Sequence, residues 1–219
     1  MNSASYVPFA FVAFILVFFG LMIVLVRRQQ RKTLENLTKL AGRLGLELKR
    51  QPAKLGFEPL PAVEGRHHGR PVRFFNYSTG SGKSRRTWGA VSAAVPGAGA
   101  FTLELAPENF LTRIVTALGM QDIQVGDPAF DRAFIVRSND VASAVAALLP
   151  EIRTRLLAAF PRNVGGELAV KGGEVRYAEV GGLQDAALVT RLADMLEVVC
   201  DLAEVAEALP VLQPQPQIL

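Results

Sequence analysis

The sequence predicts an α+β protein: one N-terminal transmembrane helix followed by a domain with an antiparallel sheet and packed helices. Three observations predict it. Residues 7–26 form one uncharged apolar run. Short segments rich in β-branched and aromatic residues alternate with glycine-containing turns, and apolar residues recur at helical spacing over 183–208. We divide the chain into a transmembrane anchor with its basic segment (1–32), a cytosolic domain (33–209) and a flexible tail (210–219).

The apolar run VPFAFVAFILVFFGLMIVLV has the length and composition of a membrane span. Its twenty residues reach ~30 Å as a helix at ~1.5 Å per residue, which is the thickness of a bilayer's hydrocarbon core. A basic segment follows directly where a cleavage site would lie, which favours a retained anchor over a secretory signal peptide. A buried core helix is the alternative interpretation.

The basic segment RRQQRK determines the predicted orientation. Its cations Arg27, Arg28, Arg31 and Lys32 follow the run, and no cation precedes it. Because lysine and arginine next to a span are retained on the cytoplasmic side, these four residues are the predicted topology determinants. The sequence therefore predicts a single-pass protein of the inner (cytoplasmic) membrane, with its N-terminus outside and its domain in the cytoplasm.

Composition favours one globular domain after the anchor. Half of the residues are hydrophobic and a fifth are charged. The single cysteine, Cys200, rules out an intramolecular disulfide framework. The net charge of +4 equals that of RRQQRK, so the remaining chain is neutral, with its cations concentrated toward the membrane. Nucleic acid is not a predicted partner, because no aromatic-basic motif accompanies the pI of 9.5.

The predicted strands are short and bounded by turns. VRFFNYS and TWGAVSAAV are expected to form a hairpin about the turn TGSGKSRR, with FTLEL as the third strand of a meander. The density of proline and glycine over 51–69 predicts loops around one short strand. The predicted strands cover residues 72–78, 87–95, 101–105, 134–138, 167–170 and 174–180.

Helices are predicted where apolar residues recur at steps of three and four. Gly45 and Gly119 supply C-terminal stops, SND supplies an N-cap, and Pro150 marks a helix start or kink. The first helix after the anchor is expected to pack on the domain rather than on the membrane surface. The last helix has a wide apolar face, which predicts packing on the sheet rather than a coiled coil. The predicted helices cover residues 33–44, 107–119, 141–149, 150–161 and 183–208.

The string GSGKS at 80–84 is similar to the end of a phosphate-binding P-loop. A P-loop requires glycine where this chain has Tyr77, and a helix where Arg85 and Arg86 lead into a strand. The string therefore predicts a cationic hairpin tip. Near an anionic membrane, Lys83, Arg85 and Arg86 are candidates for contact with lipid headgroups, at ~1 kcal/mol per charge.

No catalytic, cofactor-binding or metal-binding residues are predicted. His67 and His68 are adjacent, and adjacent side chains of an extended segment point to opposite faces, so they are interpreted as exposed loop residues. Asp127 in GDPAFD is expected to bond backbone amides in a turn, with Phe130 entering the core. Whether the protein is an enzyme stays open, because dispersed Ser, His and Asp residues meet only in space.

The strings LAGRLGLEL, EGRHHGRPVR and GDPAFDRAFIVRSND, in this order, resemble uncharacterised bacterial proteins with a single N-terminal anchor and a cytosolic α+β domain. The resemblance covers most of residues 33–200 and implies topology, with no assigned activity, cofactor or site residue.

The predicted function is a membrane-tethered cytosolic interaction or regulatory module without catalytic activity. Its predicted partners are the lipid bilayer and another membrane or cytosolic protein. One alternative is a membrane-anchored sensor that binds a small ligand or lipid. The other alternative is a hydrolase with dispersed site residues.

Overall fold

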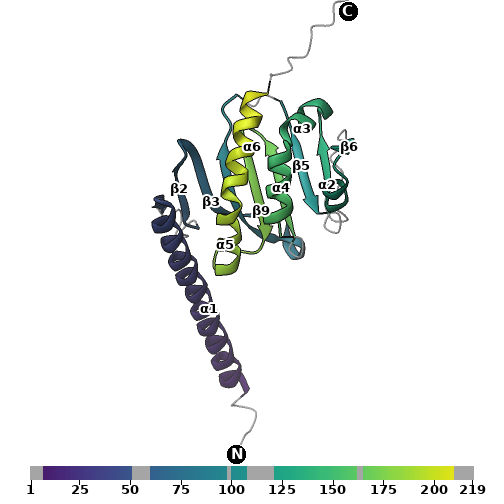
Figure 1. The fold of residues 1–219 in the computed structure, drawn as a ribbon. Coiled ribbons are helices and arrows are strands. Elements are labelled where there is room, and N and C mark those ends of the chain that lie inside the picture. The colour runs from purple at the N-terminus through teal and green to yellow at the C-terminus, as the bar shows by residue number, and fades with distance from the viewer. Residues whose placement is uncertain (1–6, 51–59, 98–99, 108–120, 162–164, 210–219) are drawn as a thin grey trace, which may run out of the picture.

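The computed structural model describes residues 7–50, 60–97, 100–107, 121–161 and 165–209, and within them it leaves out the side chains of 7–10, 13, 121 and 122. These residues form two layers, with helices on one face of an antiparallel sheet (Figure 1). The predicted α+β class is confirmed. The predicted helix at 107–119, the flexible tail at 210–219 and the loops at 51–59 lie outside the described residues.

Within the described residues the sheet has nine strands, and every neighbouring pair is antiparallel. Their order is β1-β2-β3-β4-β9-β8-β5-β7-β6. The strands are β1 (Glu47–Lys49), β2 (Ala62–His67), β3 (Arg70–Thr79), β4 (Arg86–Ala94), β5 (Leu103–Pro107), β6 (Gln121–Ile123), β7 (Phe134–Ser138), β8 (Gly166–Lys171) and β9 (Glu174–Val180).

The helices lie on one face of the sheet, where α5 and α6 pack on β4 and β9 (Figure 1). Asp127, Asp140 and Asp185 cap the N-termini of α2, α3 and α5 through their side chains. The helices are α1 (Val7–Leu44), α2 (Pro128–Ala133), α3 (Val141–Ala147), α4 (Pro150–Ala159), α5 (Ala186–Asp194) and α6 (Leu196–Ala208), with the 3-10 turn η2 (Gly82–Ser84).

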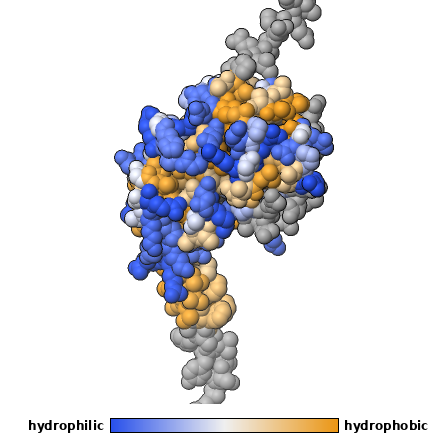
Figure 2. Space-filling model, viewed as in Figure 1, coloured by the Kyte–Doolittle hydropathy of each residue, from blue (hydrophilic) through white to orange (hydrophobic). Residues whose placement is uncertain are grey.

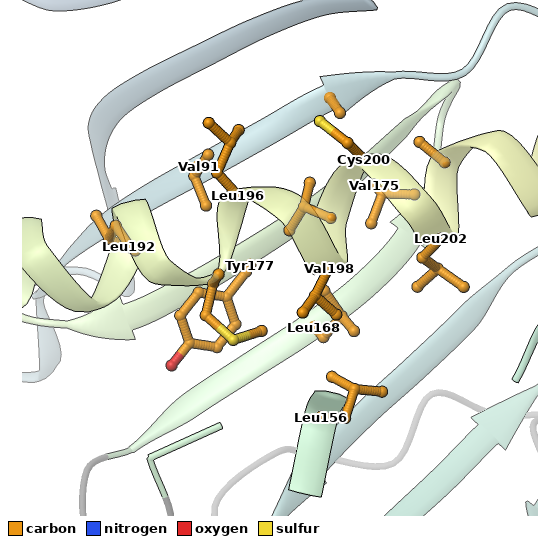
Figure 3. Close-up of a cluster of buried hydrophobic side chains, with 14 of the residues drawn as sticks. Val91, Leu156, Leu168, Val175, Tyr177, Leu192, Leu196, Val198, Cys200 and Leu202 are labelled. Atoms are coloured by element: carbon orange, nitrogen blue, oxygen red, sulfur yellow. The ribbon is translucent and has the colours of Figure 1, made fainter. Parts of the chain in front are cut away.

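The hydrophobic core fills the space between the two layers. Leu192 and Leu196 of the helices lie over Val91 and Tyr177 of the sheet, and all four side chains are buried (Figure 3). Burying each leucine side chain stabilises the fold by ~2 kcal/mol. Alternate strand residues face this core, which is the period-two pattern that the sequence predicts.

Gly89 of β4 allows α5 to approach the sheet closely. A Cβ at this position would lie 2.7 Å from Cδ2 of Leu188, a side chain that is itself buried. Gly89 is therefore required by the packing of α5 on β4, which leaves no room for a side chain.

Three predicted elements are wrong in detail. The predicted strand FTLEL overlaps β5 only from Leu103 to Leu105, and β5 pairs with β7 and β8, not with β4, so the chain makes no three-stranded meander there. The last helix is broken at Met195, which ends α5 and begins α6, and both segments contact β4 and β9. The helix at 33–44 is the end of the longer α1.

The remaining strand predictions in the described residues are confirmed, including the hairpin of β3 and β4. The short strands β1 and β6 were not predicted, because three residues are too few to show a period-two pattern.

Helix α1 has two contrasting halves. Its first half is exposed and apolar, with 67% of the Phe14 surface and 70% of the Val17 surface accessible. Its last turns are buried through Leu37 and Leu40, where α1 contacts β1, β2 and α5. The projecting part changes from hydrophobic to hydrophilic toward the domain (Figure 2). In the part of the chain that the structure describes, no helix meets the combined length and apolarity needed to cross a bilayer.

Candidate functional site

The face of the sheet opposite the helices carries the candidate site. No described helix lies on this face (Figure 1). Because successive side chains of a strand point to opposite faces, the sequence neighbours of each core-facing residue point to this face. We call it the helix-free face, and define it by Glu104, Arg73, Phe75, Tyr77, Trp88, Ala90, Arg137, Glu167, Arg176 and Ala178.

An aromatic cluster forms the centre of the helix-free face. Tyr77 and Trp88 are register partners on β3 and β4, and their rings stack with centroids 6.1 Å apart and planes 8° from parallel. Phe75 lies 5.9 Å from Tyr77, and the Trp88 indole donates a hydrogen bond of 2.8 Å to Oγ1 of Thr79. Cross-strand aromatic pairs of this kind stabilise a sheet by up to ~1 kcal/mol each.

Two guanidinium groups lie over this aromatic cluster. Arg73 is centred 4.7 Å from the Phe75 ring, and Arg176 is centred 4.9 Å from the Tyr77 ring. Arg176 also pairs with Glu174 at 3.5 Å, yet its buried Nε makes no hydrogen bond within the described residues. The face therefore presents guanidinium cations above aromatic rings, and the Nε donor of Arg176 makes no hydrogen bond within the described residues.

Glu167 is a half-buried carboxyl of this face, as Glu104 is too. The Tyr77 hydroxyl donates a hydrogen bond of 3.2 Å to its Oε1. Burial raises the pKa of Glu167, and the nearby Arg176 charge and the Tyr77 hydrogen bond oppose the rise. Burial, together with the Glu167 charge, also raises the pKa of Tyr77, which therefore stays a hydrogen-bond donor.

Two hollows open on the helix-free face. The smaller, about 110 Å³, is lined by Arg137, Glu167 and Arg176, with Glu104 and Lys171 at its margin. The larger, about 560 Å³, lies toward β2 and the turn between β8 and β9. Its charged lining residues are Lys49, Glu64, Arg66, Arg73 and Glu174. The larger volume falls within the ~300–1,000 Å³ that small-ligand sites occupy.

The residues predicted to determine topology are not part of this face. Arg27, Arg28, Arg31 and Lys32 are all exposed along α1. Lys83, Arg85 and Arg86 are also exposed, at the tip of the β3–β4 hairpin. The cations of α1 are thus apart from the helix-free face, whereas Arg86, two residues before Trp88 on β4, lies at the end of this face.

The hairpin tip and the projecting part of α1 lie at the same end of the domain (Figure 1). Asn36 of α1 donates a hydrogen bond of 3.0 Å to the carbonyl of Leu183, and the Gly181 amide donates one of 2.9 Å to the carbonyl of Thr87, next to the tip. The cation group on α1 and the cation group at the hairpin tip therefore lie toward the same end of the domain.

The interpretation of the two histidines is wrong in its geometry. His68 has a φ of +49° and occupies the turn between β2 and β3, so it is not extended. Its ring stacks on His67, with centroids 4.2 Å apart, and both rings approach Glu197 of α6. The sequence feature that indicates this geometry is the two-residue turn His68-Gly69 between two strands. Hairpin turns of this length favour positive φ, and both residues have it in the structure.

The predicted contacts of GDPAFD are confirmed, but the segment forms the N-cap and body of the short helix α2 rather than a simple turn. Asp127 accepts hydrogen bonds from the Ala129 and Phe130 amides, at 3.0 and 3.2 Å, and Phe130 is fully buried. Asp131 accepts hydrogen bonds from the amides of Val125 and Gly126. Each carboxylate therefore stabilises local backbone.

Together these features define a class of protein: an antiparallel sheet covered by helices on one face and joined to a long N-terminal helix. No protein-family model matches the chain, and no curated protein sequence matches it. Among solved structures it is similar to the mycobacterial trehalose monomycolate transport factor A, TtfA. The two are 13% identical with a TM-score of 0.53, over 87% of this chain and 99% of that one. At this identity the likeness supports the fold alone.

Proposed function

We propose that this chain is a membrane-tethered module of the cytoplasmic face, without catalytic activity, that binds a partner protein of a lipid-transport system. The observation that carries the proposal is the continuity of α1. One uninterrupted helix joins exposed apolar side chains, a basic segment and a buried end that is part of the domain.

The course of α1 supports a rigid tether. Leu37, Leu40 and Ala41 are buried against the domain, so the end of the helix is fixed. About eleven residues separate this buried end from the apolar half, which is ~16 Å of helix. A flexible linker would leave the distance and angle between the domain and the proposed anchor at 7–26 variable. A continuous helix fixes both.

The charges support the proposed orientation, with the N-terminus outside the inner membrane and the domain in the cytoplasm. Arg27, Arg28, Arg31 and Lys32 follow the apolar half directly. The exposed cations of the hairpin tip lie at the same end of the domain (Figure 1), where anionic headgroups would attract them.

The similar structure suggests the process. TtfA is a transport factor for trehalose monomycolate, and we propose by analogy of fold that this chain assists movement of a lipid or glycolipid. The helix-free face is the proposed surface for the partner protein, because it presents exposed Arg73 and half-buried Arg176 over the half-buried Phe75 and Tyr77 rings, while Trp88 beneath them is buried. Aromatic residues and arginine are the side chains that dominate binding energy at protein interfaces.

A second candidate function is binding of a small ligand or lipid headgroup by the same face. The larger hollow favours this candidate, because its volume of about 560 Å³ suits a small molecule and its lining carries both signs of charge. In this case the domain would act as a membrane-anchored sensor.

Site-specific photocrosslinking in intact cells tests the partner surface. Benzoylphenylalanine is placed at Arg73 on the helix-free face and, as the matched control, at exposed Glu204 on α6. We expect one discrete protein adduct from position 73 and none from position 204. Equal adducts from both positions, or no protein adduct from position 73, would refute the proposed surface. Adducts with lipid alone would favour the sensor.

A further inference from the structure

Three metal-ligating side chains meet where the β2–β3 turn touches α6. His67 Nε2 lies 2.7 Å from Glu197 Oε1, and His68 Nδ1 lies 3.7 Å from Glu197 Oε2. The three ligand atoms all lie within 4.8 Å of one another. This cluster is on the helix side of the sheet, away from the helix-free face.

The turn creates the cluster. His67 ends β2 on the face that α6 covers, and the positive φ of His68 turns its ring back over the ring of His67. Glu197 stands in the first turn of α6 and points to both rings. The turn therefore places the two imidazoles side by side, next to the same carboxylate.

We propose that His67, His68 and Glu197 bind a divalent transition metal, with Zn²⁺ as the expected ion. Two imidazole nitrogens and one carboxylate oxygen are a known donor set for Zn²⁺, at ~2.0–2.2 Å from the ion. Tetrahedral ligands at that distance are ~3.3 Å apart. The observed separations of 2.7 and 3.7 Å lie on either side of this value, and the two imidazole rings, stacked 26° from parallel, rotate apart so that both nitrogens point at one ion.

The exposure of the cluster agrees with an open coordination position. The His67 side chain is 16% exposed, whereas those of His68 and Glu197 are 72% and 49% exposed. Three protein ligands with one solvent-facing side leave the fourth position to water or to an incoming group.

Zinc titration of the full chain tests the proposal. The protein is purified in mild detergent without a polyhistidine tag and titrated with ZnCl₂ by calorimetry, and CoCl₂ absorption reports the geometry. We expect one ion per chain and the intense visible bands of tetrahedral cobalt. His68→Gln and Glu197→Gln should each weaken Zn²⁺ binding by about tenfold or more.

Two matched variants separate metal binding from general effects. Glu207→Gln removes another carboxylate of α6, one that pairs with Arg70 and not with the histidines. Cys200→Ser removes the cysteine of α6, a residue type that also binds zinc. Both should bind Zn²⁺ as the wild type does. His68 is largely exposed, so His68→Gln should keep the wild-type melting temperature, and loss of binding there reports a lost ligand.

Wild-type affinity retained by His68→Gln would overturn the three-ligand site. Zinc binding that is lost equally in Glu207→Gln, or is absent in the wild type, would overturn it as well.

Discussion

The guanidinium group of Arg191 lies against the fully buried carboxylate of Glu179, with Nη2 2.6 Å from Oε2. Arg191 Nε also donates to this carboxylate, and the Tyr177 hydroxyl donates a hydrogen bond of 2.8 Å to its Oε1. The hydrogen bonds to the Glu179 carboxylate raise the pKa of Arg191, so the guanidinium stays charged. The interaction joins α5 to β9, the central strand beneath the helices.

Arg191→Met should destabilise the domain by about 3 kcal/mol, because it leaves the Glu179 charge buried without its cation. Chemical unfolding in mild detergent measures the change. The double variant Arg191→Met with Glu179→Leu should recover much of the loss, since both charges are then removed. A loss below about 1 kcal/mol in the single variant would show that water replaces the arginine.

Gly89→Ala should destabilise the domain by about 1–3 kcal/mol, because the new Cβ would lie 2.7 Å from buried Leu188. The matched control is Gly42→Ala on α1, where the added Cβ meets no atom within 4 Å. That change should stabilise by up to about 1 kcal/mol through helix propensity. Melting temperatures measure both effects, and a shift of the same sign in both variants would contradict the close approach of α5.

Glu167→Gln should raise stability at neutral pH and leave it unchanged in acid. The folded state raises the pKa of Glu167, chiefly through burial, so it binds the proton more tightly than the unfolded chain does. Wild-type stability therefore falls as the pH rises above the ordinary value of 4.5, and the neutral glutamine escapes this loss.

Melting temperatures at about pH 4 and about pH 8 measure the difference between Glu167→Gln and the wild type. Tyr77→Phe is the companion variant. It removes the hydrogen bond that favours the charged carboxylate, so it should steepen the loss of stability with rising pH. A Glu167→Gln variant that is weaker than the wild type at both pH values would show that the carboxylate is favourable in place.

Local patterns predicted most of the fold. Period-two segments gave the strands β3, β4, β7, β8 and β9, and the capping position of Asp140 follows from SND. The order of the strands in the sheet could not be predicted from local patterns. FTLEL pairs with strands that lie far along the chain, and short-range patterns carry no information on such pairing.

Candidate sites were harder to predict, for the same reason. The stacking of Tyr77 on Trp88 depends on the register of β3 and β4, and the burial of Glu179 depends on Arg191, twelve residues later. Alternation suggested that His67 and His68 diverge, whereas the positive φ of His68 brings them together. Turn chemistry was the one local feature that could have revealed the cluster.

Replacing Arg27, Arg28, Arg31 and Lys32 by glutamine should disturb the proposed topology, because these cations supply the charge difference across the span. Alkaline phosphatase and a fluorescent protein are fused separately to the C-terminus. The wild type should give fluorescence and no phosphatase activity, and the fourfold variant a mixture of both. Lys83→Gln with Arg85→Gln is the control and should match the wild type. Active phosphatase on the wild-type chain would contradict the cytoplasmic domain.

The hairpin tip should lie near the headgroups when the full chain is reconstituted in vesicles with about one third anionic lipid, since each cation contributes ~1 kcal/mol. A spin label at Ser81→Cys, in a Cys200→Ser background, reports contact with nickel-chelating headgroups. Contact should fall several-fold in wholly zwitterionic vesicles, and likewise when Lys83, Arg85 and Arg86 are replaced by glutamine. A label at Lys171→Cys, at the end of β8 farther from the tip, is the control and should show little contact. Equal contact at Ser81→Cys in both vesicle types would show that the tip does not bind anionic lipid.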